Sequence, residues 1–132
     1  MIYTMSPAEL ATLRQLIQTH KAHFREDFSD YLTEHSDIFA TFVERTFDIF
    51  EAGWPRYSAS AVISAMRWHS DVTEGPTGSG YKIRDTFAAD FARLAMLRWP
   101  EELIEFFGTC HSPIRGDWRA LKAEIVRELG RG

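Results

Sequence analysis

Two histidines and a carboxylate near the N-terminus are the first candidates for chemistry. His20 and His23 are three residues apart, and Asp27 follows four residues later. On one continuous helix, these spacings place all three side chains on the same face. Two imidazoles and a carboxylate are ligands that zinc accepts, but the sequence places no fourth ligand beside them. Surface helices often carry such residues by chance, so we predict a solvated face and no metal cofactor.

A glycine-rich stretch in the middle of the chain matches a phosphate-binding loop only in part. A P-loop places lysine directly after its second glycine, follows it with Ser or Thr, and lies between a strand and a helix. Here Tyr81 separates Lys82 from Gly80, so the lysine comes one residue late; Ile83 replaces the hydroxyl residue, and a helical pattern precedes the stretch. We therefore predict an irregular connection from Ser70 to Tyr81 rather than a nucleotide site.

Two further residue pairs resemble parts of catalytic sites, but neither forms a complete site. Cys110 is followed directly by His111, but side chains adjacent in sequence do not normally face each other, and no third group orients them. His69 and Asp71 are a weak acid–base pair, because a general base also needs a pocket and a substrate within reach. No set of catalytic residues converges, so the sequence favours a protein that is not an enzyme.

Cations and aromatic residues around the glycine-rich connection are the most informative feature. Some lie at the end of the helical pattern before the connection, and the others lie before or within the pattern after it. If the two helices run antiparallel, several of these side chains gather at one end. Cations interleaved with flat rings bind phosphates and stacked bases, or an acidic protein surface. We call this set the central patch: Arg67, Trp68, Tyr81, Lys82, Arg84 and Arg93.

A structural interpretation of the same residues is the alternative. Arg93 can pair with Asp90, one turn before it on the same helix. Arg67 can likewise pair with Asp71, and the aromatic rings can belong to the core. The sequence leaves both interpretations open.

The formal net charge of −4 is unevenly distributed along the chain. Residues 1–53 carry four basic and nine acidic groups, a net of −5. Residues 54–98 carry six basic and four acidic groups, a net of +2, and residues 99–132 carry five and six, a net of −1. This small central surplus is not the strong basic footprint of a typical nucleic-acid-binding protein. The acidic N-terminal half supports a rival hypothesis, a protein-binding adaptor or inhibitor such as a phage or mobile-element protein.

Helical periodicity begins at a capping box and continues through the N-terminal quarter. Ser6 and Glu9 flank Pro7, which suits the first position of a helix. Apolar residues then recur at helical spacing as far as Leu32 without a glycine or proline. A single helix of about 27 residues would span about 40 Å, so we expect a break near His20.

Further helices are predicted after caps at Ser36, Ser58 and Asp85, with the second of these ending at Trp68-His69. A short sixth helix is expected over 101–107, and only Gly80 to Ile83 resembles a short strand. A final helix begins at Asp117 and carries an apolar stripe of Trp118, Leu121, Ile125 and Leu129. The predicted core residues are Phe39, Phe42, Val43, Val62, Ile63, Phe91, Leu94 and Ala95. The predicted fold class is all-α, a compact bundle of five to seven helices in a single domain, residues 1–132.

The composition indicates the cellular environment in which we expect the protein to work. The chain has 132 residues, 45% hydrophobic and 26% charged, which is typical of a globular protein outside the membrane. Cys110 is the only cysteine, which excludes an intrachain disulfide and suits a reducing compartment. The N-terminus lacks the pattern of a secretory signal, and no apolar run reaches the roughly 18 residues that span a bilayer. We therefore expect a cytoplasmic protein with no membrane partner.

Several short residue groups in the middle of the chain resemble a sequence pattern found in other proteins. They are Tyr57-Ser58, Arg67-Trp68, Lys82-Ile83, Ala92-Arg93, Pro100 and Phe106-Phe107. In these residues the chain resembles a family of short, uncharacterised bacterial and phage hypothetical proteins, over about residues 50–110. The family pattern has asparagine-rich sequence after the Lys-Ile pair and an arginine after the Phe-Phe pair, and Arg84-Asp85 and Thr109-Cys110 depart from it.

The resemblance implies a coherent central unit and brings no activity with it. From the residues, the favoured function is binding, with nucleic acid as the partner of the central patch. The alternative is a protein partner bound by the acidic N-terminal helices.

Overall fold

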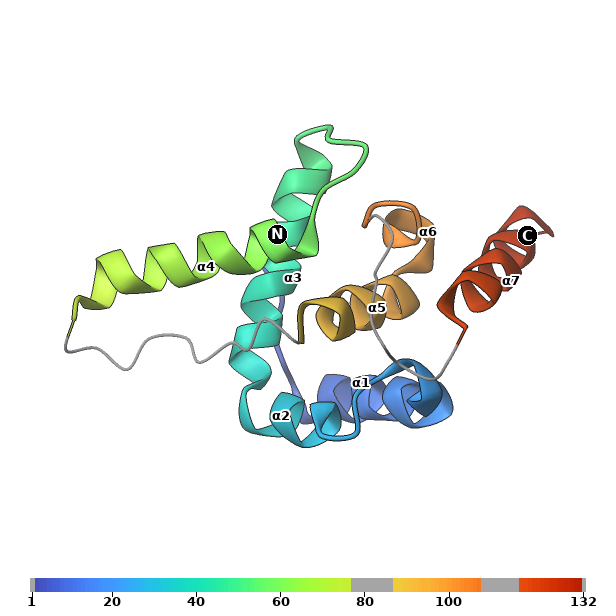
Figure 1. The fold of residues 1–132 in the computed structure, drawn as a ribbon, viewed down its shortest axis with the longest axis horizontal. Helices are drawn as coiled ribbons and strands as arrows, with labels where there is room; N and C mark the ends of the chain where they lie inside the picture. The colour runs from blue at the N-terminus through green and yellow to red at the C-terminus, as the bar shows by residue number, and fades with distance from the viewer. Residues whose placement is uncertain (1, 77–86, 108–116, 132) are drawn as a thin grey trace.

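The computed structural model of the chain describes residues 2–76, 87–107 and 117–131 (Figure 1). Within these ranges the structure is helical, and the only β-type pairing is an isolated bridge between Tyr57 and Phe107. The prediction of an all-α bundle is confirmed. The elements in order are α1 (Pro7–Thr19), the 3-10 helix η1 (Lys21–His23), α2 (Phe28–Glu34), α3 (Ser36–Glu51), α4 (Ala59–Glu74), α5 (Ala88–Arg98), α6 (Pro100–Leu103) and α7 (Trp118–Arg131).

The N-terminal helix begins and ends as the sequence predicts. The Ser6 hydroxyl accepts a hydrogen bond from the Glu9 backbone N–H at 3.1 Å, and Pro7 occupies the first turn. The helix stops at Thr19, and the chain then forms η1 before α2 begins at Phe28. This confirms the predicted break near His20. The break turns the chain so that both α1 and α2 place apolar residues in one core.

Two predicted boundaries around α3 and α4 are wrong. Ser36 lies inside α3 rather than capping it, because the His35 carbonyl accepts the first hydrogen bonds of that helix. Ser58 does cap α4, but α4 continues to Glu74, so the beginning of the predicted connection from Ser70 is helical. Nothing in the sequence interrupts the helix before Gly75, whose φ of 75° ends it.

Helix α6 is shorter than the sequence predicts. This helix ends at Leu103 instead of continuing to Phe107. The Phe106 carbonyl accepts a hydrogen bond from the Tyr57 backbone N–H at 3.0 Å, so these backbone groups pair outside the helix. The predicted cap Asp85 and the predicted strand Gly80 to Ile83 lie outside the described residues.

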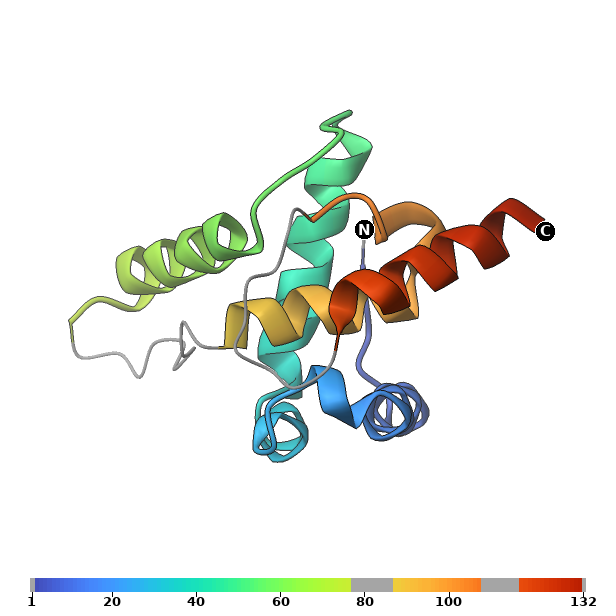
Figure 2. The same ribbon diagram turned by 45° about the vertical axis from the view of Figure 1, so that its right-hand side comes forward.

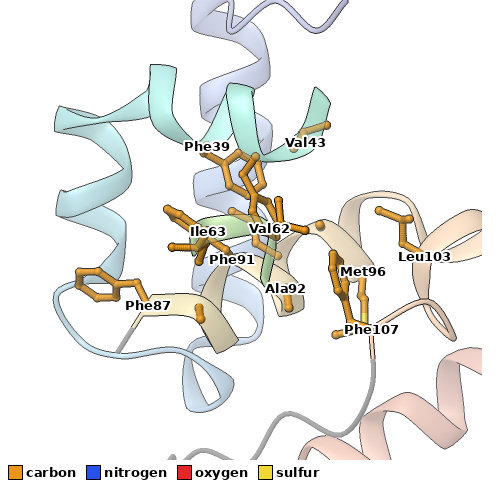
Figure 3. Packing of buried hydrophobic residues seen from close by; sticks show 14 of the residues in the cluster. Phe39, Val43, Val62, Ile63, Phe87, Phe91, Ala92, Met96, Leu103 and Phe107 are labelled. Carbon is orange, nitrogen blue, oxygen red and sulfur yellow. The ribbon is translucent and has the colours of Figure 1, made fainter. Parts of the chain in front are cut away.

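Helix α5 is the centre of the bundle. It packs against α1, α3, α4 and α6, and all of its residues from Phe91 to Met96 are buried. Figure 3 shows side chains of α3, α4 and the α6 region converging on it. The Phe91 ring lies 5.3 Å from the Phe42 ring and 5.7 Å from the rings of both Phe28 and Phe39, measured between centroids. The eight predicted core residues are all buried, which confirms that prediction.

Truncating Phe91 to alanine tests the central position of α5. The ring is fully buried, so its loss should lower the free energy of unfolding by about 3–5 kcal/mol. Urea denaturation followed by circular dichroism measures this change. Trp54→Ala removes a larger ring that is 58% exposed, and it should cost less than about 1 kcal/mol. Equal costs for the two variants would contradict the packing described above.

Candidate functional site on helix α4

The central patch divides into three groups in the structure. Tyr81, Lys82 and Arg84 lie outside the described residues. Arg67 and Trp68 lie on α4, where Arg67 is half-buried and Trp68 is 67% exposed. The remaining member, Arg93, lies on α5 and is buried.

Placing Arg93 in an exposed patch is wrong, because only 2% of this residue is accessible to solvent. Its Nη1 atom donates a hydrogen bond to the His23 carbonyl at 2.9 Å. Its guanidinium carbon lies 5.3 Å from the centre of the Trp118 ring, a cation–π contact. The side chain therefore joins α5 to η1 and α7, and it does not reach a ligand at the surface.

The neighbouring carboxylate, Asp90, is also fully buried. Its Oδ1 atom accepts a hydrogen bond from the Arg25 backbone N–H at 3.0 Å, and the Arg25 Nε atom lies 3.9 Å from Oδ2. Burial raises the pKa of Asp90 to about 6, although the bond from Arg25 and the charges of Arg25 and Arg93 lower it. Arg93 therefore affects Asp90 through its charge, while Arg25 donates the hydrogen bond to this carboxylate.

His23 completes this buried cluster from the side of η1. Its ring packs edge-on against Trp118, with 5.8 Å between the ring centroids. Burial, and then the charge of Arg93, lower the pKa of His23, so the neutral imidazole is favoured. Asp90 Oδ2 and His23 Nδ1 are buried atoms without a hydrogen-bond partner in the described part of the chain.

A shared face of His20, His23 and Asp27 would require a continuous helix, and the structure has none there. His20 follows the end of α1, His23 belongs to η1, and Asp27 precedes α2, so no continuous helix carries all three. The two imidazole centroids are 6.5 Å apart. In residues 2–76, 87–107 and 117–131, no group of three or more His, Cys, Asp or Glu side chains is placed to hold a metal ion. Cys110 and His111 lie outside these ranges.

The outer face of α4 carries an exposed apolar stripe. Trp68 and Val72 are one turn apart, and they are 67% and 64% exposed. Ala61 and Ala65 are exposed and continue the same stripe toward the start of the helix. The opposite side of α4, with Val62, Ile63 and Met66, is buried against α3 and α5. Figures 1 and 2 show α4 extending from the body toward one edge of the molecule.

Polar groups beside this stripe do not form a catalytic set. His69 and Asp71 are both exposed on α4. Two residues apart on a helix, they point to different sides of it. Arg67 already has a partner within the chain.

A second exposed aromatic residue lies in the connection between α3 and α4. The Trp54 ring packs edge-on against the Tyr57 ring at 5.9 Å, and Arg56 beside it is exposed. Trp54 is not among the site residues predicted from the sequence. The signal was present, because Trp54 lies between Gly53 and Pro55 in a connection where no helical stripe could bury it.

Another basic residue of the central segment is engaged inside the fold. The Arg98 guanidinium donates two hydrogen bonds to the Glu9 carboxylate, at 3.1 and 3.2 Å, and lies over the Trp99 ring. The Tyr3 hydroxyl also donates to Glu9. Burial and this carboxylate raise the pKa of Tyr3. The cluster holds the N-terminal segment on α1 and α5. Because the Arg98 guanidinium is bound in this cluster, it is not available to a ligand.

Comparisons with known proteins add no assignment. No family model, no curated protein and no solved structure matches the chain. The resemblance to short bacterial and phage proteins remains a prediction. None of the described helices combines the length and apolar character that a membrane span requires.

The buried carboxylate leads to a prediction about stability and pH. Because the pKa of Asp90 is about 6 in the fold and 3.8 ordinarily, the folded protein binds the extra proton between these values. This stabilisation is complete below pH 3.8 and is lost as the pH rises through 6, a change of about 3 kcal/mol. Asp90→Asn abolishes the titration. The free energy of unfolding of this variant, minus that of the wild type, should therefore increase by about 2–3 kcal/mol from pH 4 to pH 7.

Urea denaturation at a series of pH values measures that difference. Asp48→Asn, which changes an exposed carboxylate on α3, is the control and should give a nearly constant difference. A constant difference for Asp90→Asn as well would show that Asp90 is ionised normally in the fold.

Proposed function

We propose that the protein is a small, non-catalytic cytoplasmic binding protein, and that its partner is another protein held by the outer face of α4. The observation that carries the proposal is the exposure of Trp68 and Val72 on adjacent turns of a helix whose other side is buried. Folding alone gives no reason for two large apolar side chains at those positions. Tryptophan is the residue most enriched among those that dominate binding energy at protein interfaces.

The shape of the stripe suits a groove or a helix on the partner. Ala61 and Ala65 are small, so a partner can approach the first turns of α4 closely. Trp68 then provides a large ring that fits a pocket, and Val72 extends the contact by one turn. Amphipathic helices that bind in grooves present anchors at this spacing. The stripe is short, so it fits a modest and reversible interface.

The protein-binding surface proposed here is the outer face of α4, whereas the sequence pointed to the acidic N-terminal helices. Charge on those helices attracts a partner at long range and increases the association rate, but exposed charges contribute little affinity. The acidic half therefore favours a partner with a basic surface, while the apolar stripe on α4 contributes most of the binding energy.

Nucleic acid is the second candidate, and exposed rings beside cations favour it. Trp68 follows Arg67 in the chain, and Trp54 lies beside the exposed Arg56. However, Arg93 and Arg98 are bound within the fold, so fewer cations are available than the sequence indicates. With three phosphate contacts on duplex DNA, affinity would change by only about 2.7 log units per log unit of salt.

Site-specific photocrosslinking tests the proposal. The full chain carries a benzophenone amino acid at position 68 and is irradiated in cells that express it. We expect a protein adduct that is digested by protease and unaffected by nuclease. Val72→Asp, at an exposed position that tolerates the change in the fold, should reduce the adduct at least about fivefold, because it charges an apolar contact.

The matched control carries the benzophenone at position 54, which also replaces an exposed tryptophan. It should not give the same adduct. Nuclease-sensitive adducts at position 68, together with binding to mixed-sequence DNA or RNA that weakens steeply with salt, would replace the protein partner with a nucleic acid. Identical adducts at both positions, or none at position 68, would also overturn the proposal.

A further inference from the structure

Helix α7 is attached to the rest of the protein differently from the other long helices. The close packing between helices in the described chain involves α1 to α6, and α7 is not part of it. Figure 2 shows α7 along one side, with its C-terminal half extending beyond α5 and α6. Its attachment therefore depends on a few side chains rather than on a continuous interface.

Burial decreases along the apolar stripe of α7. Trp118, in the first turn, is 8% exposed, whereas Leu121 and Ile125 are half-buried and Leu129 is 36% exposed. One ion pair in the second turn, between Lys122 and the exposed Glu105 at 3.8 Å, adds little to this contact. Trp118 is the main anchor of the helix.

The Trp118 ring belongs to the hydrophobic core cluster, but part of the surface beneath it is polar. The Trp118 ring covers the Arg93 guanidinium and contacts the His23 imidazole. When the ring leaves, both groups gain water, and their hydration offsets part of the free energy lost from the apolar contact. Opening α1, α3 or α4 would instead expose phenylalanines and leucines. We therefore expect separation of α7 to cost less free energy than opening α1, α3 or α4.

We propose that α7 is a latch: it detaches as a unit when Trp118 leaves Arg93 and His23, and acid favours this opening. Detachment exposes the apolar stripe of Trp118, Leu121 and Ile125 while the bundle of α1 to α6 remains folded. This inference is independent of the function proposed for α4.

The direction of the pH effect follows from the groups around His23. In the closed state, burial and the charge of Arg93 disfavour the imidazolium, His20 adds to this effect, and Asp117 opposes it. In the open state water reaches the imidazole while Arg93 and His20 stay beside it, so its pKa rises toward the ordinary value and the open state binds the proton more tightly. Stability of the closed state is thus lost as the pH falls below 6.5. Asp90 titrates in the opposite sense, but its closest contacts are with Arg25, at the η1–α2 connection.

Hydrogen–deuterium exchange of the full chain, analysed by mass spectrometry, tests the latch. Protection factors are calculated at pH 7.5 and pH 5.5 against an unfolded reference, for peptides from α7 and from residues 91–96 of α5. At pH 7.5 we expect α7 to be at least about tenfold less protected than α5. Its protection should fall several-fold at pH 5.5, while that of α5 does not fall.

Two substitutions assign the effect to the latch. His23→Gln keeps the backbone carbonyl that binds Arg93 and removes the titrating ring, so the fall in α7 protection should disappear. His69→Gln, at the exposed histidine of α4, should leave the fall unchanged. Trp118→Ala should reduce α7 protection and change α5 protection less than about twofold.

Three results would overturn the proposal. The first is equal protection of α7 and α5 in the wild type, and the second is an unchanged pH dependence in His23→Gln. The third is joint loss of protection in α5 and α7 on Trp118→Ala, which would make α7 part of the cooperative core.

Discussion

Burial of α5 on all sides is the constraint on which the rest of the structure depends. Polar side chains on a helix in that position depend on partners within the protein, because water does not reach them. Asp90 and Arg93 are the two charged residues on its buried segment, and each contacts a different part of the chain. Asp90 accepts the backbone N–H of Arg25, and Arg93 donates to the carbonyl of His23 and lies under Trp118. These two charges therefore link α5 to the connection between α1 and α2 and to α7.

The same constraint separates structural charge from surface chemistry. Arg93, which the sequence places in a candidate ligand site, is used inside the fold, as is the neighbouring cation Arg98. The exposed aromatic residues, in contrast, have no structural use in the described chain beyond the contact between Trp54 and Tyr57. One side of helix α4 packs in the core, and the other side exposes Trp68 and Val72 to solvent. A binding role for α4 explains why that second side is apolar.

The fold was largely predictable because its signals are local. Apolar spacing identified the core faces of α3, α4 and α5, and Ser6 and Ser58 were correctly identified as caps. The predicted end of α4 is wrong because the three glycines and the proline within residues 75–80 indicate a connection, but nothing before Gly75 interrupts the helix. The site was less predictable because exposure of Trp68 and burial of Arg93 depend on which helices surround each position. The contact of Arg93 with His23, across 70 positions of sequence, has no local signature.

Replacing Arg93 with methionine tests the structural role of the α5 charges most directly. The variant keeps most of the apolar volume but removes the donor to His23 and one of the two positive charges that act on Asp90. Loss of one member of a buried ionic cluster costs about 3–5 kcal/mol, so urea denaturation should show a decrease of that order. Arg67→Met, at the half-buried cation of α4, is the control and should change stability by less than about 1 kcal/mol. Wild-type stability of Arg93→Met would contradict the account, because it would mean that Arg93 is not needed by the fold and is free to serve a ligand.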